Sequence, residues 1–186
     1  EKAAKVFPDR LSIIHEDKHF TWKQTFTRCK QLARSLSQKL AVGDVVGFIA
    51  SNTPELYEAH FGVPMAGMIL NAINYRLDAQ TIAYIIDHSD LKMLFVDTEF
   101  LSLGEEATSL SKKKPDIIII KDEQTFTFKE PYAQMDYEEF LASDDVVSDH
   151  YKPLDEWENL SINYTSGTTG NPKGVVYHHR GAYLNA

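Results

Sequence analysis

The sequence predicts an α/β fold, with mostly parallel sheets and flanking helices. Two observations support this prediction. Three short segments are unbroken apolar runs, the pattern of strands that are buried on both faces: Val45–Ile49, Met93–Val96 and Ile117–Ile120. Segments with apolar residues at helical spacing lie between these runs, and strands that alternate with helices in this way pair in parallel. With 186 residues, the chain is long enough to enclose one core.

The first elements are predicted to be a β-hairpin and a helix. Residues 11–22 contain two short β-prone segments around the polar turn Glu16–Lys18. Thr21 and Gln24 have the spacing of a capping box, which marks the start of a helix. The buried face of this helix is predicted from apolar residues three and four positions apart: Phe26, Cys29, Ala33, Leu36 and Leu40. The single cysteine of the chain falls on that face, which favours a buried structural thiol over a nucleophile.

Three further helices are expected. Thr53–Glu55 combines a capping residue, a proline and an acidic residue, so a helix begins there. It is predicted to continue to about Leu70, with a kink at Pro64. Asp78 is predicted to cap the next helix, whose buried residues are Ile82, Ile85 and Ile86. The last of the three is expected around residues 98–110.

The C-terminal part is predicted to contain two connections and two strands. Residues 121–135 mix polar and aromatic side chains and are interpreted as a β-turn excursion. Residues 143–159 are acidic and contain a proline, as is typical of a surface connection. Leu160–Tyr164 alternates in polarity and is predicted to be a strand, and Val175–Tyr177 is strand-like as well.

The segment between these two strands carries the clearest chemistry. Residues 165–174 combine hydroxyl side chains, glycines and a lysine. Glycines allow left-handed backbone and the close approach of a large anion, and amides, hydroxyls and a lysine can donate to phosphate oxygens. We interpret the segment as a cradle for a polyphosphate, although a loop without function has a similar composition. It is not the P-loop of ordinary NTPases, because Gly174 rather than Ser or Thr follows Lys173, and a strand rather than a helix comes next.

Tyr164–Gly174 resembles the signature loop of the adenylate-forming superfamily, which includes acyl-CoA synthetases, luciferases and the adenylation domains of peptide synthetases. Every defined position of the loop matches. Weaker matches to the opening segments of that family cover the rest of the chain: Val6–Arg10, Phe20–Trp22 and Gly43–Val46. Two others look most like the plant-type acyl-activating enzymes, which act on short or medium acids: His60–Gly67 and His178–Asn185.

The resemblance implies the N-terminal part of the large domain of an adenylate-forming enzyme. Residues 1–186 would then be an AMP-binding domain truncated at both ends, without the small C-terminal domain. The expected activity is that of an acid–CoA ligase, with ATP, Mg²⁺ and coenzyme A, and a small carboxylic acid as substrate. The nucleotide contacts carried over from the family are Thr165, Ser166, Gly167, Thr168, Thr169, Gly170, Lys173 and Gly174. Lys173 would also be catalytic, since it would neutralise charge that develops on the departing pyrophosphate.

Two other functions stay open at this point. The parent enzyme could load a different acceptor after adenylation, such as a carrier protein, or the chain could be a short product that binds nucleotide without catalysis. The net charge of −8 argues against general binding to nucleic acid. The longest apolar stretch, Phe61–Ile73, is shorter than the ~20 residues of a membrane-spanning helix. The resemblance implies a cytoplasmic or peroxisomal location.

Other polar residues are weaker candidates. His178 and His179 are predicted to be adjacent in a strand, so they would point to opposite faces and would not bind one metal ion. A histidine is common at the position of His179 in the family, which implies a structural role or a place at the edge of the pocket. Arg180 is expected in a surface ion pair, and Tyr57 and His60 are expected to be packing residues. No metal site is therefore predicted.

Overall fold

The computed structural model describes residues 1–121, 134–141, 151–165 and 170–185. Its strands are β1 (Leu11–His15), β2 (Lys18–Thr21), β3 (Val45–Ile49), β4 (Ile69–Ala72), β5 (Leu91–Asp97), β6 (Asp116–Ile120), β7 (Asn159–Thr165) and β8 (Lys173–His178). Its helices are α1 (Lys2–Val6), α2 (Trp22–Ser37), α3 (Pro54–Met65), α4 (Ala79–Ser89), the short 3-10 helix η1 (Thr98–Phe100), α5 (Leu101–Leu110), α6 (Tyr137–Leu141) and α7 (His179–Leu184).

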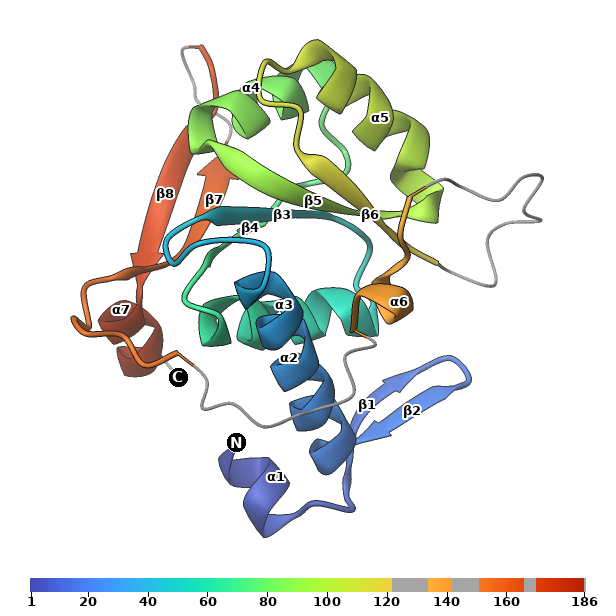
Figure 1. The fold of residues 1–186 in the computed structure, drawn as a ribbon, viewed down its shortest axis with the longest axis vertical. Coiled ribbons are helices and arrows are strands. Elements are labelled where there is room, and N and C mark those ends of the chain that lie inside the picture. Colours follow the sequence, from blue (N-terminus) through green and yellow to red (C-terminus); the bar gives the residue numbers. More distant parts are fainter. Residues whose placement is uncertain (122–133, 142–150, 166–169, 186) are drawn as a thin grey trace.

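Within these residues, six strands form one sheet in the order β6-β5-β3-β4-β7-β8 (Figure 1). The pairs β5–β6, β3–β5, β3–β4 and β4–β7 are parallel, and only β7–β8 is antiparallel. The prediction of an α/β fold with a mostly parallel sheet is therefore confirmed. β1 and β2 form a separate antiparallel hairpin.

Helices cover both faces of the sheet. α2, α3 and α6 lie on one face, and α4 and α5 lie on the other (Figure 1). Successive residues of a strand point to opposite faces, so β3 contributes to two cores. Phe48 joins the α2–α3 core, where its ring stacks on that of Phe95 at 4.4 Å, whereas Ile49 joins the α4–α5 core. All five residues of β3 are buried, which explains its unbroken apolar sequence.

One boundary prediction is wrong. Helix α3 ends at Met65 rather than near Leu70, and Ile69–Ala72 is strand β4. The break lies at Gly67, whose φ of +77° is a left-handed conformation that favours glycine and ends the helix. The chain then enters the sheet, where Ile69 N–H donates to the Asp44 carbonyl at 2.9 Å.

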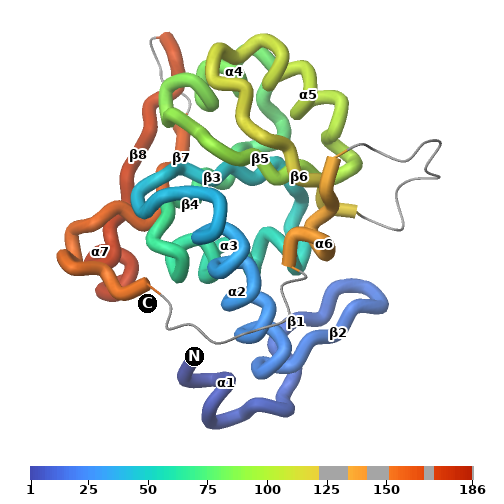
Figure 2. Tube along the Cα trace, viewed as in Figure 1, coloured from blue at the N-terminus to red at the C-terminus, as the bar shows by residue number. Residues whose placement is uncertain are grey.

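Most of the N-terminal predictions are confirmed, although Leu40 lies beyond the end of α2 at Ser37. Thr21 and Gln24 form a reciprocal capping box at the start of α2. Cys29, Ala33 and Leu36 are buried on the inner face of this helix, together with Leu32, which the predicted spacing omitted. Phe26 and Leu40 are only partly buried. Figure 2 shows α1 and the β1–β2 hairpin beside the N-terminal end of α2, away from the six-stranded sheet.

The later helices also agree with the sequence. The Asp78 carboxylate accepts from Thr81 N–H at 2.9 Å, and three isoleucines of α4 are fully buried: Ile82, Ile85 and Ile86. η1 and α5 together occupy residues 98–110, as predicted. The predicted excursion at 121–135 falls almost entirely outside the described residues, as does half of the connection at 143–159. The described part of that connection, residues 151–158, contains no helix or strand and is mostly exposed, as expected of a surface connection. Helix α6 was not predicted from the sequence.

No helix among the described residues has the length and apolar character needed to cross a membrane.

Candidate functional site

The candidate phosphate loop joins the two strands of an antiparallel hairpin. β7 is held to the parallel sheet through the pairing of Leu70 with Ser161, and β8 pairs with β7. Thr165 stands opposite Lys173, so the two ends of the loop meet directly across the hairpin. Both predicted strands are confirmed. Four of the predicted site residues lie outside the described residues: Ser166, Gly167, Thr168 and Thr169.

Two glycines of the loop are favoured for different reasons. Gly170 has a φ of +136°, a backbone conformation that side chains with a Cβ rarely adopt. At Gly174 a Cβ would lie 2.8 Å from Cδ1 of Ile162 and 3.3 Å from Cζ of Tyr164, so these β7 side chains would have to shift. Backbone shape therefore accounts for one glycine, and the approach of β7 side chains accounts for the other.

Thr165 and Lys173 present polar groups on the same face of the hairpin. Directly opposed residues of an antiparallel pair point to the same side of the sheet, and both side chains are exposed. No carboxylate among the residues that the structure describes pairs with Lys173. A hydroxyl donor and an ammonium group are thus available to an anion at the base of the loop.

Tyr164, the residue before the loop, contacts helix α4. Its hydroxyl lies 2.7 Å from Nδ1 of His88 on α4, and the two rings meet edge to face at 5.7 Å. Partial burial raises the pKa of the Tyr164 phenol. His88 was not identified from the sequence, because a single histidine on a helix gives no signal of a contact 76 residues away.

The hairpin ends at a helix, which corrects the prediction for the paired histidines. Only His178 belongs to β8, and His179 is the first residue of α7. His178 Nδ1 accepts from Gly181 N–H at 3.0 Å and so caps this helix, which explains why the strand stops there. Arg180 forms the expected ion pair, with Glu156, and its guanidinium lies 5.9 Å from the ring of Trp157.

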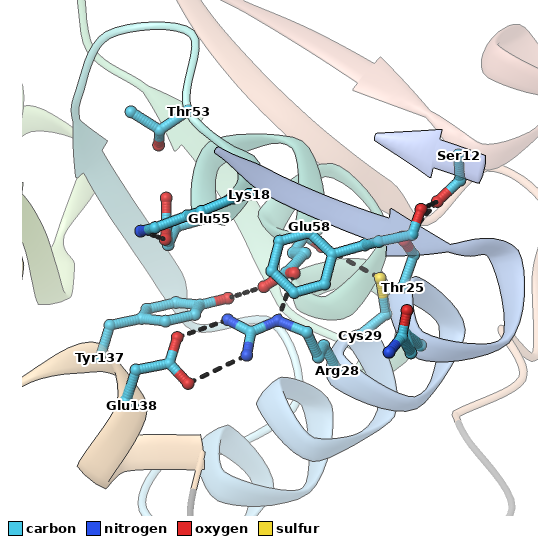
Figure 3. Close-up of polar contacts among 12 residues, drawn as sticks. Ser12, Lys18, Thr25, Arg28, Cys29, Thr53, Glu55, Glu58, Tyr137 and Glu138 are labelled. Carbon is cyan, nitrogen blue, oxygen red and sulfur yellow. Dashed lines mark hydrogen bonds and ion pairs between the residues drawn. The ribbon is translucent and has the colours of Figure 1, made fainter. Parts of the chain in front are cut away.

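A second polar cluster joins three helices (Figure 3). Arg28 of α2 donates from Nε to the Glu58 carboxylate of α3 at 2.5 Å. Its two terminal nitrogens donate to both carboxylate oxygens of Glu138 on α6, at 2.9 and 2.6 Å. The Tyr137 hydroxyl donates to the other oxygen of Glu58 at 2.9 Å. Glu58 is fully buried, so this cluster ties helices together rather than facing a substrate.

Burial dominates the titration of Glu58 and Tyr137 in this cluster. It raises the pKa of Glu58, although Arg28 and Tyr137 act in the opposite direction, and it raises the pKa of Tyr137 well above its usual value. Burial also raises the pKa of the adjacent Cys29 thiol to about 12. Cys29 is 3% exposed, so the prediction of a buried structural thiol is confirmed.

A surface cleft of about 550 Å³ lies between β1 and the N-terminal half of α3. Its lining includes His15, Asn52, Tyr57 and His60. Tyr57 packs on Phe61 with ring centroids 5.2 Å apart, as expected of a packing residue. The same expectation is wrong for His60, which is exposed and hydrogen-bonded to the Leu56 carbonyl of its own helix.

Among the described residues, no three histidine, cysteine, aspartate or glutamate side chains lie close enough together to hold a metal ion.

Comparison with protein families gives a match over the whole chain. The model of the family described as AMP-binding enzyme matches residues 1–186. The chain is 46% identical to the acetate–CoA ligase CCL3 of Humulus lupulus, over 99% of its own length and 34% of that protein. It is 44% identical to a peroxisomal benzoate–CoA ligase of Arabidopsis thaliana, over 99% of the chain and 33% of that protein. The chain thus spans about a third of the length of these relatives.

Solved structures show the same fold. The crystal structure of an anthranilate CoA ligase in complex with anthranoyl-AMP superimposes with a TM-score of 0.86 at 23% identity, over 97% of this chain and 34% of that one. A benzoate CoA ligase from Burkholderia xenovorans gives a TM-score of 0.83 at 15% identity, over 100% of this chain and 34% of that one.

Proposed function

The chain belongs to the AMP-binding enzyme family, and we propose that it forms the N-terminal part of the large domain of an acid–CoA ligase. The observation that carries this proposal is the base of the phosphate loop. Thr165 and Lys173 lie opposite each other at the end of a hairpin and offer a hydroxyl and a positive charge on one face. These groups donate hydrogen bonds, which suits the oxygens of a polyphosphate.

The proposed reaction has two steps. A carboxylate oxygen of the acid attacks the α-phosphorus of ATP, the bond from that phosphorus to the α–β bridging oxygen breaks, and pyrophosphate leaves with the bonding electrons. The sulfur of coenzyme A then attacks the acyl carbon, the bond from carbon to the AMP oxygen breaks, and the thiol proton passes to solvent. Lys173 acts in the first step, where its ammonium group stabilises the negative charge that grows on the departing pyrophosphate.

We propose that the loop residues Ser166, Gly167, Thr168, Thr169, Gly170 and Gly174 join Thr165 and Lys173 in holding the β- and γ-phosphates. Mg²⁺ bound to ATP would supply further charge neutralisation. The ammonium group of Lys173 is a donor without acceptor capacity, so it fits the phosphate oxygens and not the ion, and the Thr165 hydroxyl can donate to a phosphate oxygen as well. The chain's own contribution to the reaction is therefore to bind and orient the leaving group.

The substrate is proposed to be a small carboxylic acid. The relatives are named as ligases of acetate, butyrate, cinnamate and benzoate. Several of them are also named as peroxisomal, which supports a peroxisomal site of action, with the cytoplasm as the alternative. A peroxisomal targeting signal at the C-terminus of the reading frame would distinguish the two.

The test uses the longest reading frame that contains this chain. The purified protein is assayed for acid-dependent exchange of labelled pyrophosphate into ATP, with acetate, butyrate and benzoate, and then for thioester formation with coenzyme A. Exchange followed by thioester formation is the expected result. Exchange without thioester formation would show a different acceptor, and the absence of exchange with all three acids would refute the proposed activity on them.

A further inference from the structure

Polar contacts link the base of the phosphate loop to α4, on the α4–α5 side of the sheet, from His88 and from the adjacent Ser89. Tyr164 directly precedes the loop, and its hydroxyl lies 2.7 Å from His88 Nδ1. The hydroxyl donates to this nitrogen when the imidazole carries its proton on Nε2. The ring of His88 also stacks on that of Tyr84, with centroids 5.3 Å apart, so the histidine is held by its own helix while it contacts β7.

The Tyr164 ring touches both strands that carry the loop. It belongs to β7, and it lies across Gly174 of β8, where an added Cβ would be only 3.3 Å from its Cζ. Gly174 is bonded to Lys173, and Tyr164 is bonded to Thr165. A displacement of this ring would therefore move both residues from which the loop departs.

The hairpin is less deeply buried than α4. β7 joins the parallel sheet at the registered pair Leu70 with Ser161 and packs Ile162 against the α4–α5 core, and its residues are partly buried or exposed. α4, in contrast, is anchored by fully buried isoleucines and by the Asp78 cap. The contact between α4 and Tyr164 thus connects a partly exposed hairpin to a well-packed helix.

We propose that His88 is a positioning residue for the phosphate loop. Through the Tyr164 hydroxyl it holds the base of the loop against α4, and so places the Lys173 and Thr165 side chains where the polyphosphate end of ATP binds. His88 itself touches no phosphate. The inference rests on the proposed function, because it assigns the loop to ATP.

The test is a double-mutant cycle in the longest reading frame that contains the chain. Y164F, H88A and the double variant are compared by the KM for ATP in pyrophosphate exchange and by the Kd for ATP from calorimetry. Each single change is expected to raise both constants about threefold to tenfold, the range of one net hydrogen bond. The double variant should be no worse than either single one, because both changes remove the same contact. The KM for the carboxylic acid should stay unchanged.

Conservative and distant variants separate positioning from general damage. H88N keeps a polar group near the place of Nδ1 and should recover most of the ATP affinity. Y183F and H19N alter an exposed tyrosine of α7 and an exposed histidine of β2, and should behave as wild type.

Three outcomes would overturn the inference. The effects of the two changes could be additive in the double variant, the single variants could bind ATP as tightly as wild type, or the KM for ATP and the KM for the carboxylic acid could rise equally. A wild-type protein that binds ATP but forms no adenylate would refute the proposed function alone, and the Kd values would then decide the role of His88. A protein that binds no ATP would overturn both.

Discussion

At the scale of single residues, Lys173 carries the strongest functional prediction. Its ammonium group is exposed at the base of the loop, and no described carboxylate competes for it. We expect K173M to lower the rate of adenylation by roughly 100-fold to 1,000-fold, the usual effect of removing one group that stabilises transition-state charge. Single-turnover formation of the acyl-adenylate measures this. K39M, at an exposed position after α2, is the control, and a loss below threefold for K173M would contradict the catalytic role.

Cys29 gives a prediction about pH. Burial raises the pKa of its thiol to about 12 in the folded chain, whereas an exposed thiol ionises near pH 8.5. Above that pH the unfolded state releases a proton that the folded state keeps, so the free energy of unfolding falls as pH rises. We expect this loss to be roughly 1 kcal/mol per pH unit between about pH 9 and pH 12.

The measurement for Cys29 is urea unfolding at several pH values, compared with C29A. The alanine variant is less stable at neutral pH, but its stability should depend less on pH in that window. If the free energy of unfolding depended on pH in the same way for the wild type and C29A, the thiol would titrate in the folded state as it does in the unfolded chain, contrary to the prediction.

The residue scale also shows what the sequence could and could not reveal. The roles of Gly170, Lys173 and Gly174 follow from the family resemblance and stay predictions. The phosphate cradle at residues 165–174 was predicted from composition, because a cradle needs a particular set of residue types within a short segment. His88 and Arg28 were not, because each acts through a partner brought close by the fold. Arg28 lies 110 residues from Glu138, and residue type alone does not indicate such a partner.

At the scale of elements, Arg28 determines how α2, α3 and α6 are joined. Its loss leaves the Glu58 carboxylate fully buried without a cationic partner, whereas Glu138 is 64% exposed at its side chain. We expect R28M to lower the free energy of unfolding by about 3–5 kcal/mol, the usual cost of leaving a buried charge unpaired. E138Q, which breaks the exposed half of the same cluster, should cost less than about 1 kcal/mol.

Urea unfolding followed by tryptophan fluorescence compares these variants. R28M/E58L should be more stable than R28M, because the second change removes the unpaired charge. If R28M and E138Q lowered the free energy of unfolding equally, the buried and exposed halves of the cluster would contribute equally to stability. That result would contradict the prediction, which rests on the burial of Glu58.

Element types were predicted more accurately than element ends. Capping side chains mark where α2 and α4 begin, so both starts were predicted from local chemistry. The end of α3 was missed because the apolar run through Leu70 continues from helix into strand without a change in composition. The left-handed Gly67 marks the break, but a glycine alone does not distinguish a helix end from a position within the helix.

At the scale of the whole molecule, β8 is one of the two edge strands of the described six-stranded sheet. Val175, Val176 and Tyr177 are 41%, 47% and 44% exposed, so both faces of this strand carry uncovered apolar side chains. An open apolar edge promotes pairing between chains, and a lysine on it prevents this. We expect purified residues 1–186 to self-associate with rising concentration and V176K to reduce this. Analytical ultracentrifugation measures the effect, with V6K as the control and a monomeric wild type as the contradicting result.

The final prediction concerns what residues 1–186 can do by themselves. The match covers about a third of each relative, so about two thirds of each relative lies outside it. A phosphate loop orients the leaving group, but adenylation also requires the carboxylate to be held in line with the α-phosphorus. We therefore expect purified residues 1–186 to give no pyrophosphate exchange with acetate, butyrate or benzoate, under conditions in which the longer protein is active. Circular dichroism confirms folding of the shorter protein, and acyl-adenylate formed by it would show that this part holds both reactants.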